Sequence, residues 1–234
     1  MPLKNFLCPD NVVRPVAQCL DKCPLPERCL SLPTLHECGN DRKWYGNPST
    51  TQLLNPTRIA YLQITCDYTI KPQDRAFALL GVRHHAKLEA VAKRLGMIAE
   101  EKLKGEVSGI IDLIEPTNDN PDEFILYDYK SWGSYAVKKA LGSAKKEPDI
   151  ENVTLQLNNY RIMIATLGFK VVKLYVQATV RDGGTFTAKQ NGIDAKILKI
   201  PIPILPDDDV AEYFMTKRQM LLDALAKNEM PQNN

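Results

Sequence analysis

The hydrophobic and polar positions of this chain predict a helix followed by a β-hairpin in its middle part. Apolar residues recur at helical spacing from Asp74 to about Gly96, and these two residues are suited to cap the helix at its two ends. Two runs rich in β-branched and aromatic residues, 106–114 and 123–130, flank a loop of Pro, Asn and Asp. This pattern is typical of two antiparallel strands with a longer connection.

The second half of the chain continues to alternate between the two kinds of pattern. It predicts a helix from near Asp149 to Gly168, a strand at 169–180, another strand at about 195–204 and a last helix at about 208–226. Helices and strands that follow one another in this order predict a single mixed α/β layer architecture.

Residues 1–48 differ from the rest of the chain. They contain seven of the 16 prolines, which prevents long helices and predicts a loop-rich segment that something must hold in place. The same segment contains most of the cysteines, which are Cys8, Cys19, Cys23, Cys29 and Cys38, and only Cys66 lies beyond it. We therefore expect two parts, a Cys/Pro-rich segment at 1–48 and a larger domain at 49–234.

Composition excludes several classes of protein. Hydrophobic residues make up 44% and charged residues 25% of the 234 residues, which is typical of a soluble globular protein and argues against a disordered or fibrous chain. The 30 Lys and Arg are nearly balanced by 28 Asp and Glu. This balance excludes a basic coat over the whole surface but allows a local basic groove.

The longest apolar stretch, at 161–180, is interrupted by Arg161, Lys170 and Lys173, which argues against a membrane-spanning helix. The N-terminus has too short an apolar run for a signal peptide. We therefore expect a cytoplasmic protein, in which thiols stay reduced and clustered cysteines indicate metal binding or catalysis more than disulfides.

The predicted hairpin carries the residues with the clearest chemistry. Asp112 lies inside the apolar run GIIDLI, where a carboxylate is costly unless something neutralises it. If the turn is centred near Asn120, Asp112 lies opposite Asp128 in the partner strand, and Lys130 shares the face of Asp128 because strand side chains alternate. Two carboxylates and a lysine would then converge on one face.

Such a group suits a divalent cation with a positive donor beside it. Oxygen ligands favour Mg²⁺ or Mn²⁺ over zinc. The arrangement fits hydrolysis of a phosphodiester, in which the metal activates water and the lysine orients it or binds developing negative charge. An ordinary salt-bridged hairpin would account for Asp128 and Lys130 alone, but not for Asp112 inside an apolar strand.

These residues resemble the core of the PD-(D/E)xK nucleases. Asp112 and the Asp-Tyr-Lys sequence at 128–130 match the core motif, and GVRHHAKLE at 81–89 and QLNNY at 156–160 match two further motifs of the RecB-type branch. That branch includes the CRISPR-associated RecB-like exonucleases. The resemblance covers about residues 49–180, with four motifs in the same order. It implies a restriction-endonuclease-like core, with a central mixed β-sheet flanked by helices.

The resemblance also implies roles for individual residues. It aligns His85, not His84, with the metal-binding histidine, a choice that helical periodicity alone leaves open. It implies that Asp112, Asp128 and His85 hold the metal and that Lys130 positions the water. It further implies that Gln156 and Tyr160, one helical turn apart, contact the active-site lysine or DNA.

The cysteine segment forms a second candidate site. Cys8, Cys19, Cys23 and Cys29 provide four thiolates, which suit a [4Fe–4S] cluster or tetrahedral zinc. Iron–sulfur members of the RecB-type branch use one early cysteine and three near the C-terminus, whereas residues 67–234 here contain no cysteine. We place iron–sulfur ahead of zinc, and partly buried thiols without metal remain the alternative. Cys38 is a spare candidate ligand, and we expect Cys66 in the core.

Two stretches are candidates for contacts with DNA. The first, at 40–63, interleaves basic and aromatic residues, namely Arg42, Lys43, Trp44, Tyr45, Arg58 and Tyr61. This mixture suits a groove that follows phosphates and stacks bases, or equally a solvated face with some core aromatics. The second is a basic cluster of Lys138, Lys139, Lys145 and Lys146, of the kind that provides salt-dependent affinity without sequence reading. Trp132 and Tyr135 are either core residues, which we favour, or a platform for stacking.

Three functions are open at this point. The first is a Mg²⁺- or Mn²⁺-dependent deoxyribonuclease, an exonuclease on ends or single strands as the resemblance implies. The second is a non-catalytic DNA-binding protein with a nuclease fold. The third is a subunit whose cysteine segment serves redox or assembly in a recombination, repair or CRISPR-adaptation complex.

Overall fold

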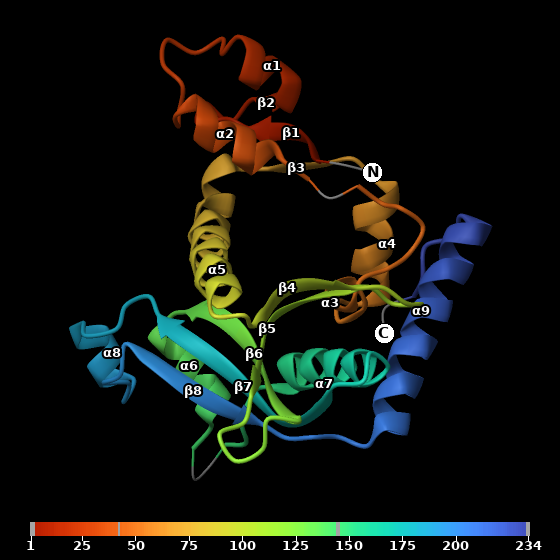
Figure 1. Cartoon of the computed structure of the whole chain (residues 1–234). Helices are drawn as coiled ribbons and strands as arrows, with labels where there is room; N and C mark the ends of the chain where they lie inside the picture. Colours follow the sequence, from red (N-terminus) through yellow and green to blue (C-terminus); the bar gives the residue numbers. More distant parts are fainter. Residues whose placement is uncertain (1–2, 42, 144–145, 233–234) are drawn as a thin grey trace. The chain divides into compact units, whose positions relative to one another are not determined.

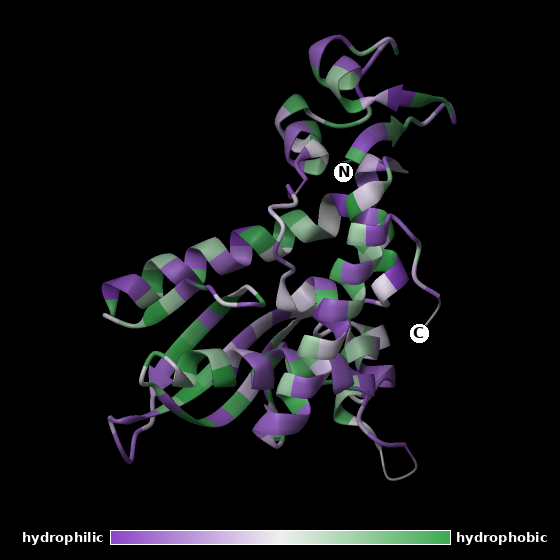
Figure 2. Ribbon diagram, turned by 90° about the vertical axis from the view of Figure 1, so that its right-hand side faces the viewer, coloured by the Kyte–Doolittle hydropathy of each residue, from purple (hydrophilic) through white to green (hydrophobic). Residues whose placement is uncertain are grey.

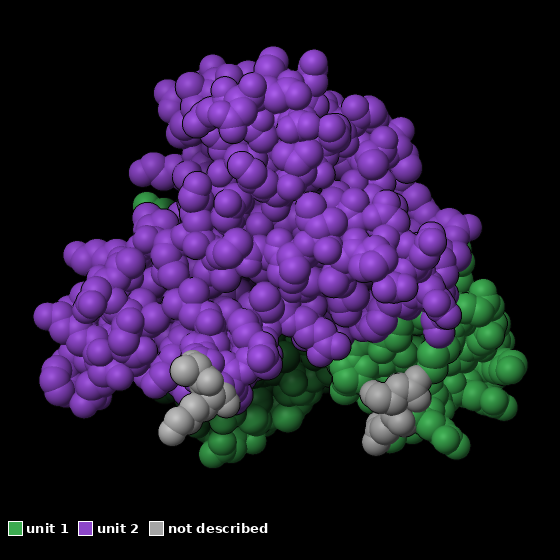
Figure 3. Space-filling view, turned by 90° about the horizontal axis from the view of Figure 1, so that it is seen from below, with its two compact units in different colours: residues 1–47, 55–83, 217–234 green, residues 48–54, 84–216 purple. Residues whose placement is uncertain are grey.

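The computed structural model describes residues 3–41, 43–143 and 146–232. The chain forms two compact units (Figure 3), the first made of residues 1–47, 55–83 and 217–234 and the second of residues 48–54 and 84–216. The Cys/Pro-rich segment expected at 1–48 thus shares the first unit with two later stretches. The expected domain at 49–234 is divided between both units.

The first unit is built from short elements around a small sheet. Its strands and helices are β1 (Leu3–Leu7), β2 (Val13–Pro15), α1 (Val16–Asp21), α2 (Leu32–Gly39), α4 (Thr57–Thr65) and β3 (Tyr68–Ile70). The strand order is β2-β1-β3, with β1 antiparallel to β2 and parallel to β3. A 3₁₀ turn at Pro72–Arg75 leads into α5 (Ala76–Arg94), which contributes residues to both units, as does α9 (Asp207–Lys227).

The core of the first unit explains why residues 1–47 need partners from later in the chain. Phe6, Leu35 and Cys38 are fully buried, and Tyr68 and Ile70 of β3 pack against them. A segment this rich in proline has few long apolar elements of its own, so β3 completes its core.

The second unit is a sheet with helices on its faces (Figure 1). Its elements are α3 (Thr50–Leu53), the second part of α5, β4 (Ile98–Leu103), β5 (Gly109–Pro116), β6 (Glu123–Trp132), α6 (Ser134–Leu141), α7 (Glu151–Ala165), β7 (Lys170–Val180), α8 (Phe186–Gln190) and β8 (Ile197–Ile202). The strand order is β4-β5-β6-β7-β8, and β6 and β7 are parallel while the other neighbours are antiparallel. The prediction of a mixed α/β fold is confirmed at this level, as a five-stranded mixed sheet flanked by helices.

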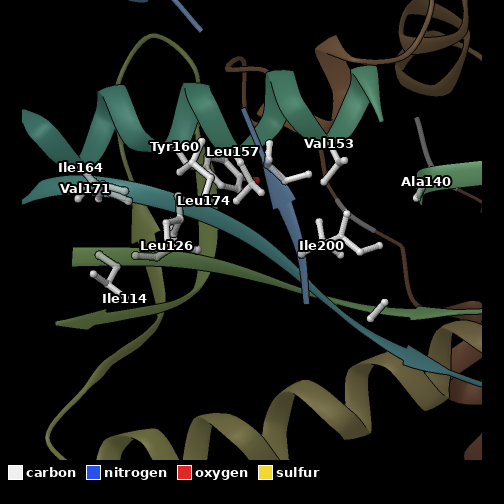
Figure 4. Packing of buried hydrophobic residues seen from close by; sticks show 14 of the residues in the cluster. Ile114, Leu126, Ala140, Val153, Leu157, Tyr160, Ile164, Val171, Leu174 and Ile200 are labelled. Carbon is white, nitrogen blue, oxygen red and sulfur yellow. The ribbon is translucent and has the colours of Figure 1, made fainter. Parts of the chain in front are cut away.

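The two faces of the sheet pack against different helices. On one face, Leu157 of α7 packs with Leu126, Leu174 and Ile200 of β6, β7 and β8 (Figure 4). On the other face, Tyr127 and Tyr129 of β6 lie in a cluster with Leu88 and Ala92 of α5. Since side chains alternate along a strand, Asp128 and Lys130 share the α7 face with Leu126.

Hydropathy follows this packing. Coloured by hydropathy, the helices show bands of hydrophobic and hydrophilic residues, as expected for helices with one packed side (Figure 2). None of the helices in the described part of the chain is long and apolar enough to cross a membrane.

The α7–sheet core leads to a prediction about stability. Leu157 is fully buried, so we expect Leu157→Ala to lower the free energy of unfolding by about 2–5 kcal/mol, the range for a leucine cavity in a packed core. Leu167, which is 59% exposed just beyond α7, is the matched control, and Leu167→Ala should cost less than about 0.5 kcal/mol. Urea unfolding followed by circular dichroism measures both. Equal effects would contradict the assignment of this core.

Candidate metal centre and active site

The candidate site lies where β5 and β6 stop pairing. The ladder between them runs from Pro116↔Phe124 to Leu113↔Tyr127. Asp112 and Asp128 come next in this register, as the turn position predicted. The Asp112 carboxylate accepts a hydrogen bond of 2.6 Å from the backbone N–H of Tyr129, through Oδ2. The side chain of one strand therefore binds the backbone of the other at the point where the ladder ends.

Three side chains from three elements converge beside the end of the β5–β6 ladder, which we call the fork of the hairpin. His85 of α5, Glu100 of β4 and Asp112 of β5 place one potential ligand atom each within 4.8 Å of one another. His85 Nδ1 lies 3.0 Å from Glu100 Oε1 and 3.4 Å from Asp112 Oδ1. Of the residues that the structure describes, these three form the one such group of His, Cys, Asp and Glu side chains.

The second ring nitrogen of His85 orients the first toward this group. Nε2 lies 3.1 Å from the carbonyl oxygen of Tyr129. A carbonyl oxygen only accepts, so Nε2 carries a proton, and the neutral ring then has its lone pair on Nδ1. Metal-binding histidines commonly donate their other N–H to a carbonyl in this way.

The protonation of His85 follows from its neighbours. Its interaction with Asp112 raises the pKa of His85 most, burial opposes this, and Glu100 adds to the rise, so that the pKa is about 9. With this pKa the ring is an imidazolium at neutral pH, and its positive charge lies beside the carboxylates of Glu100 and Asp112. A metal cation would replace this positive charge at the same position. The pKa of Glu100 is raised by burial, against the effect of its hydrogen bond to His85.

Glu100 reaches the group through an unusual backbone conformation. The β4–β5 register, Ala99↔Leu113 and Glu101↔Ile111, places Glu100 opposite Asp112. Its φ of 53° lies in the left-handed region, which is uncommon for a residue with a Cβ and costs about 1–3 kcal/mol. Strain of this kind persists only where the surroundings enforce it, and here it accompanies a carboxylate aimed at His85.

Asp128 and Lys130 form a second, adjoining group on the α7 face. Lys130 Nζ donates to Asp128 Oδ1 over 2.9 Å and lies 2.7 Å from Oδ2. Gln156 Nε2 of α7 donates to the same Oδ1 over 3.2 Å. Oδ2 is buried and accepts no hydrogen bond from any residue that the structure describes, so its one partner among these residues is the Lys130 ammonium of the ion pair.

Burial controls the ionisation of this pair. Asp128 is 3% exposed, and burial raises the pKa of its carboxyl, against the effect of Lys130. Burial is the largest single influence on Lys130 and lowers its pKa, but the charge of Asp128, its hydrogen bond and the charge of Asp112 together outweigh burial and raise that pKa. The two groups adjoin because Asp112 binds the backbone N–H of Tyr129, the residue between Asp128 and Lys130, and the charge of Asp112 raises the pKa of both side chains.

Tyr160 lies one turn from Gln156 and closes this side of the site. Gln156 Nε2 also lies 3.5 Å from the Tyr160 hydroxyl. A Cβ on Gly109 of β5 would lie 2.4 Å from Tyr160 Cε1, so only glycine there leaves room for the ring. Gln156, with Tyr160 beside it, thus supports the carboxylate of Asp128. The resemblance implied a contact with Lys130 or with DNA, and the contact in the structure is with Asp128, the ion-pair partner of Lys130.

The structure therefore rearranges the predicted ligand set. His85 and Asp112 lie together, as expected, but Glu100 completes their group and Asp128 is held by Lys130 and Gln156. Glu100 was not among the predicted ligands because it lies on β4, a strand that the hydrophobic pattern did not predict. Once β4 is recognised as a strand, the position of Glu100 opposite Asp112 indicates that Glu100 is a candidate ligand.

Two neighbours on α5 lie outside the group. His84 Nε2 is buried without a hydrogen bond to any described residue, and burial lowers the pKa of this histidine. Its ring contacts that of Tyr129 edge to face, with centroids 6.0 Å apart. Glu89 pairs with Lys93 over 2.5 Å.

The four cysteines of the predicted site gather in the first unit. Cys8 and Cys19 are buried and Cys23 and Cys29 half-buried, all as free thiols. The pKa of Cys19 is raised first by burial and then by the proximity of the other three thiols. Among the described residues no three thiol sulfurs lie within 4.8 Å of one another, whereas tetrahedral zinc needs its sulfurs about 3.8 Å apart.

The two remaining cysteines have other surroundings. Cys38, expected as a spare ligand, is fully buried beside Phe6 and Leu35 in the core of the first unit. Cys66 was expected in the core, and this is wrong, because it ends α4 and is exposed.

The predicted basic and aromatic stretches are only partly exposed. In the first, Tyr45 is 84% exposed, but Tyr61 is buried and donates to Asn228, so it has no face for stacking. In the second, Lys139 pairs with Asp149 over 2.5 Å. Arg42 and Lys145 lie outside the described residues.

Trp132 and Tyr135 differ from each other. Trp132 packs against the main core, as favoured. Tyr135 is 66% exposed, so the preference for a core position is wrong there. It lies in the first turn of α6, a helix that the hydrophobic pattern did not predict.

Comparisons with known proteins do not identify a family. No protein-family model matches the chain, and no curated protein matches it. Among solved structures, the chain is similar to one described as the crystal structure of SSO0001, with 18% identity, coverage of 80% of this chain and 82% of that chain, and a TM-score of 0.44. The chemistry of the site therefore has to carry any functional assignment.

The ligand group leads to a prediction about metal binding. We expect His85→Ala and Glu100→Gln each to weaken Mn²⁺ binding at least about 10-fold, because each removes one of three converging ligands. Glu89→Gln, on the same helix as His85 but outside the group, should leave the affinity unchanged. Isothermal titration calorimetry measures all three. If Glu100→Gln binds Mn²⁺ like the wild type while Asp128→Asn does not, the ligand set predicted from the sequence holds instead.

Proposed function

We propose that this protein is a metal-dependent deoxyribonuclease that hydrolyses phosphodiester bonds in single strands or at ends, on a restriction-endonuclease-like core. One observation carries the proposal. The His85–Glu100–Asp112 group adjoins a buried Asp128–Lys130 pair at the fork of a hairpin. The PD-(D/E)xK motifs match the same side chains, with Glu100 added.

The donor set fits a hard divalent cation. His85 Nδ1 and the carboxylates of Glu100 and Asp112 would hold it, and Asp128, whose Oδ2 is ion-paired with Lys130, is a further candidate. Mostly oxygen ligands favour Mg²⁺ or Mn²⁺. When bound, the ion would supply a Lewis acid that lowers the pKa of a water molecule and neutralises charge on the phosphate.

The side chains themselves provide the positioning. Lys130 stays charged because Asp128 raises its pKa, so its ammonium is available to bind a phosphate oxygen or to orient the attacking water. Gln156 holds Asp128 in place by donating to Oδ1, which leaves Oδ2 directed away from that bond. His85 is fixed by the Tyr129 carbonyl.

A non-catalytic DNA-binding protein is the alternative. Binding to DNA relies mainly on exposed cations that contact phosphates. It gives no reason to bury an Asp–Lys pair, whose desolvation is costly, or to strain the backbone at Glu100. The site therefore favours catalysis.

An assay with labelled DNA tests the proposal. Wild type with Mg²⁺ or Mn²⁺ should degrade single-stranded DNA, and EDTA should abolish the activity. Asp112→Asn and Lys130→Ala should each lower the rate at least about 100-fold, as expected for groups that act on the reacting phosphate. Glu89→Gln is the control with unchanged activity. Cleavage that persists in both site variants would refute the site, and DNA binding without cleavage under any divalent cation would support the alternative.

We also propose that Cys8, Cys19, Cys23 and Cys29 hold an iron–sulfur cluster that stabilises the first unit. All four are free thiols, the other three raise the pKa of Cys19, and no three of the described thiol sulfurs lie within 4.8 Å of one another. A four-iron cluster is larger than one zinc ion and accommodates such a set. Loss of the cluster would then destabilise the first unit. Assembly with recombination, repair or CRISPR-adaptation proteins is the alternative role for this unit.

Anaerobic purification tests the cluster. The protein should show broad visible absorbance that is lost in Cys23→Ser, because a missing thiolate opens the cluster. Cys66→Ser is the matched control, since Cys66 is exposed and outside the set. A colourless protein with stoichiometric zinc would overturn the iron–sulfur assignment in favour of zinc.

A further inference from the structure

The face of the sheet turned away from α7 contains a pocket of about 540 Å³. Its lining includes Leu113, Tyr127, Tyr129, Gln177 and Lys199, which come from β5, β6, β7 and β8. Tyr127 and Tyr129 are almost fully buried, while Lys199 is exposed on β8 at the edge of the sheet. Neither the metal ligands nor the Asp128–Lys130 pair belongs to this lining.

Strand register places the pocket directly beside the candidate active site. Tyr129 pairs with Gln177 on β7, and Gln177 pairs with Lys199 on β8. Since neighbouring strands lie about 4.8 Å apart, this row extends about 10 Å across the sheet. Its first member, Tyr129, lies between Asp128 and Lys130 in the sequence. Its side chain points to the opposite face from theirs.

Tyr129 also joins the pocket to the metal group. Its backbone N–H binds Asp112 and its carbonyl oxygen accepts from His85. Its ring lies edge-on to the His85 ring, with centroids 5.9 Å apart. The pocket therefore begins one tyrosine ring away from the group that would meet a phosphate, a separation that the sugar of one nucleotide can span.

The chemistry of the lining suits a nucleobase. Tyr127 stacks on Tyr175, with centroids 5.8 Å apart, and Lys199 Nζ lies 5.7 Å and 5.1 Å from the two ring centres. Apolar and aromatic walls with a few polar groups are typical of small-ligand pockets. The Gln177 amide and the Glu115 carboxylate offer a donor and acceptors to a base edge, and the Lys199 ammonium offers a contact to phosphate.

We propose that this pocket binds an unpaired base of a single DNA strand, next to the phosphate that is cut. The inference rests on the proposed nuclease function and names the class of its substrate. A base enclosed by Tyr129, Gln177 and Lys199 cannot stay stacked and paired in a duplex, so the substrate is a single strand or a frayed end.

Equilibrium binding in EDTA tests the pocket without requiring cleavage. The full chain should bind a fluorescent oligothymidine at least about 5-fold more tightly than an abasic strand of equal length, because only a strand with bases can fill the pocket and contact Gln177. Gln177→Ala should remove most of this preference. Lys199→Ala should weaken binding to both strands and lower the slope of log affinity against log salt by about 0.7, the value for one phosphate contact on a single strand.

Lys189→Ala is the matched control, since Lys189 is an exposed lysine on α8 outside the pocket. Photocrosslinking provides a second readout that does not depend on affinity. An oligonucleotide that contains 5-iodouracil should crosslink to the peptide with Tyr127 and Tyr129. Crosslinks confined to the first unit would overturn the proposal.

The outcomes separate this proposal from the nuclease function. If the protein cleaves DNA but Gln177→Ala and Lys199→Ala bind oligothymidine like Lys189→Ala, the pocket proposal fails and the nuclease function stands. If the protein does not cleave DNA but shows the base preference and the crosslink, the pocket stands and the catalytic proposal fails. Equal affinity for an oligothymidine and an abasic strand in the wild type would also overturn the pocket.

Discussion

A carboxylate on a nearly buried strand is the constraint on which the second unit depends. Asp112 lies in an apolar run, where an uncompensated negative charge would be costly. Its compensation comes from three directions, namely the backbone of β6, the imidazolium of His85 on α5, and the positive charge of Lys130 nearby. The strand β6, the helix α5 and Lys130 thus each bring a compensating group close to the Asp112 carboxylate.

The same constraint explains why the site divides into two groups. Glu100 brings a second carboxylate to His85, and Asp128 brings a third that Lys130 neutralises. Three carboxylates in this space would repel one another without the histidine and the lysine. A divalent cation would relieve the repulsion on the His85 side, while the ion pair already relieves it on the α7 side. The carboxylates of this site therefore surround positive charge, which is supplied by the His85 imidazolium and the Lys130 ammonium or, in place of the imidazolium, by a divalent cation.

Much of the fold and part of the site could be predicted from the sequence. The hairpin was predictable because strand patterns flank a loop centred near Asn120, and this register also placed Asp112 beside Asp128. The strand β4 was not, because its sequence IAEEKL lacks a clear alternation, and Glu100 was missed with it. The left-handed backbone of Glu100 depends on tertiary packing, which no local pattern encodes.

Other errors have equally local causes. Tyr135 was expected in the core rather than in a stacking platform, but it lies in the first turn of a helix and is exposed there. Cys66 was expected in the core as a small apolar residue, but it lies at the end of α4. Nothing in the proline-rich segment showed that its core would be completed by β3 from later in the chain.

The close contact between Gly109 and Tyr160 has a mechanical consequence. The Tyr160 ring occupies the space where a side chain of β5 would lie, so α7 cannot slide along the sheet without displacing that strand. One turn away on the same helix, Gln156 holds the Asp128 carboxylate. The helix α7 therefore contacts both strands of the hairpin, β5 through Tyr160 and β6 through Gln156. A shift of α7 would change the relative positions of the carboxylates that these two strands carry.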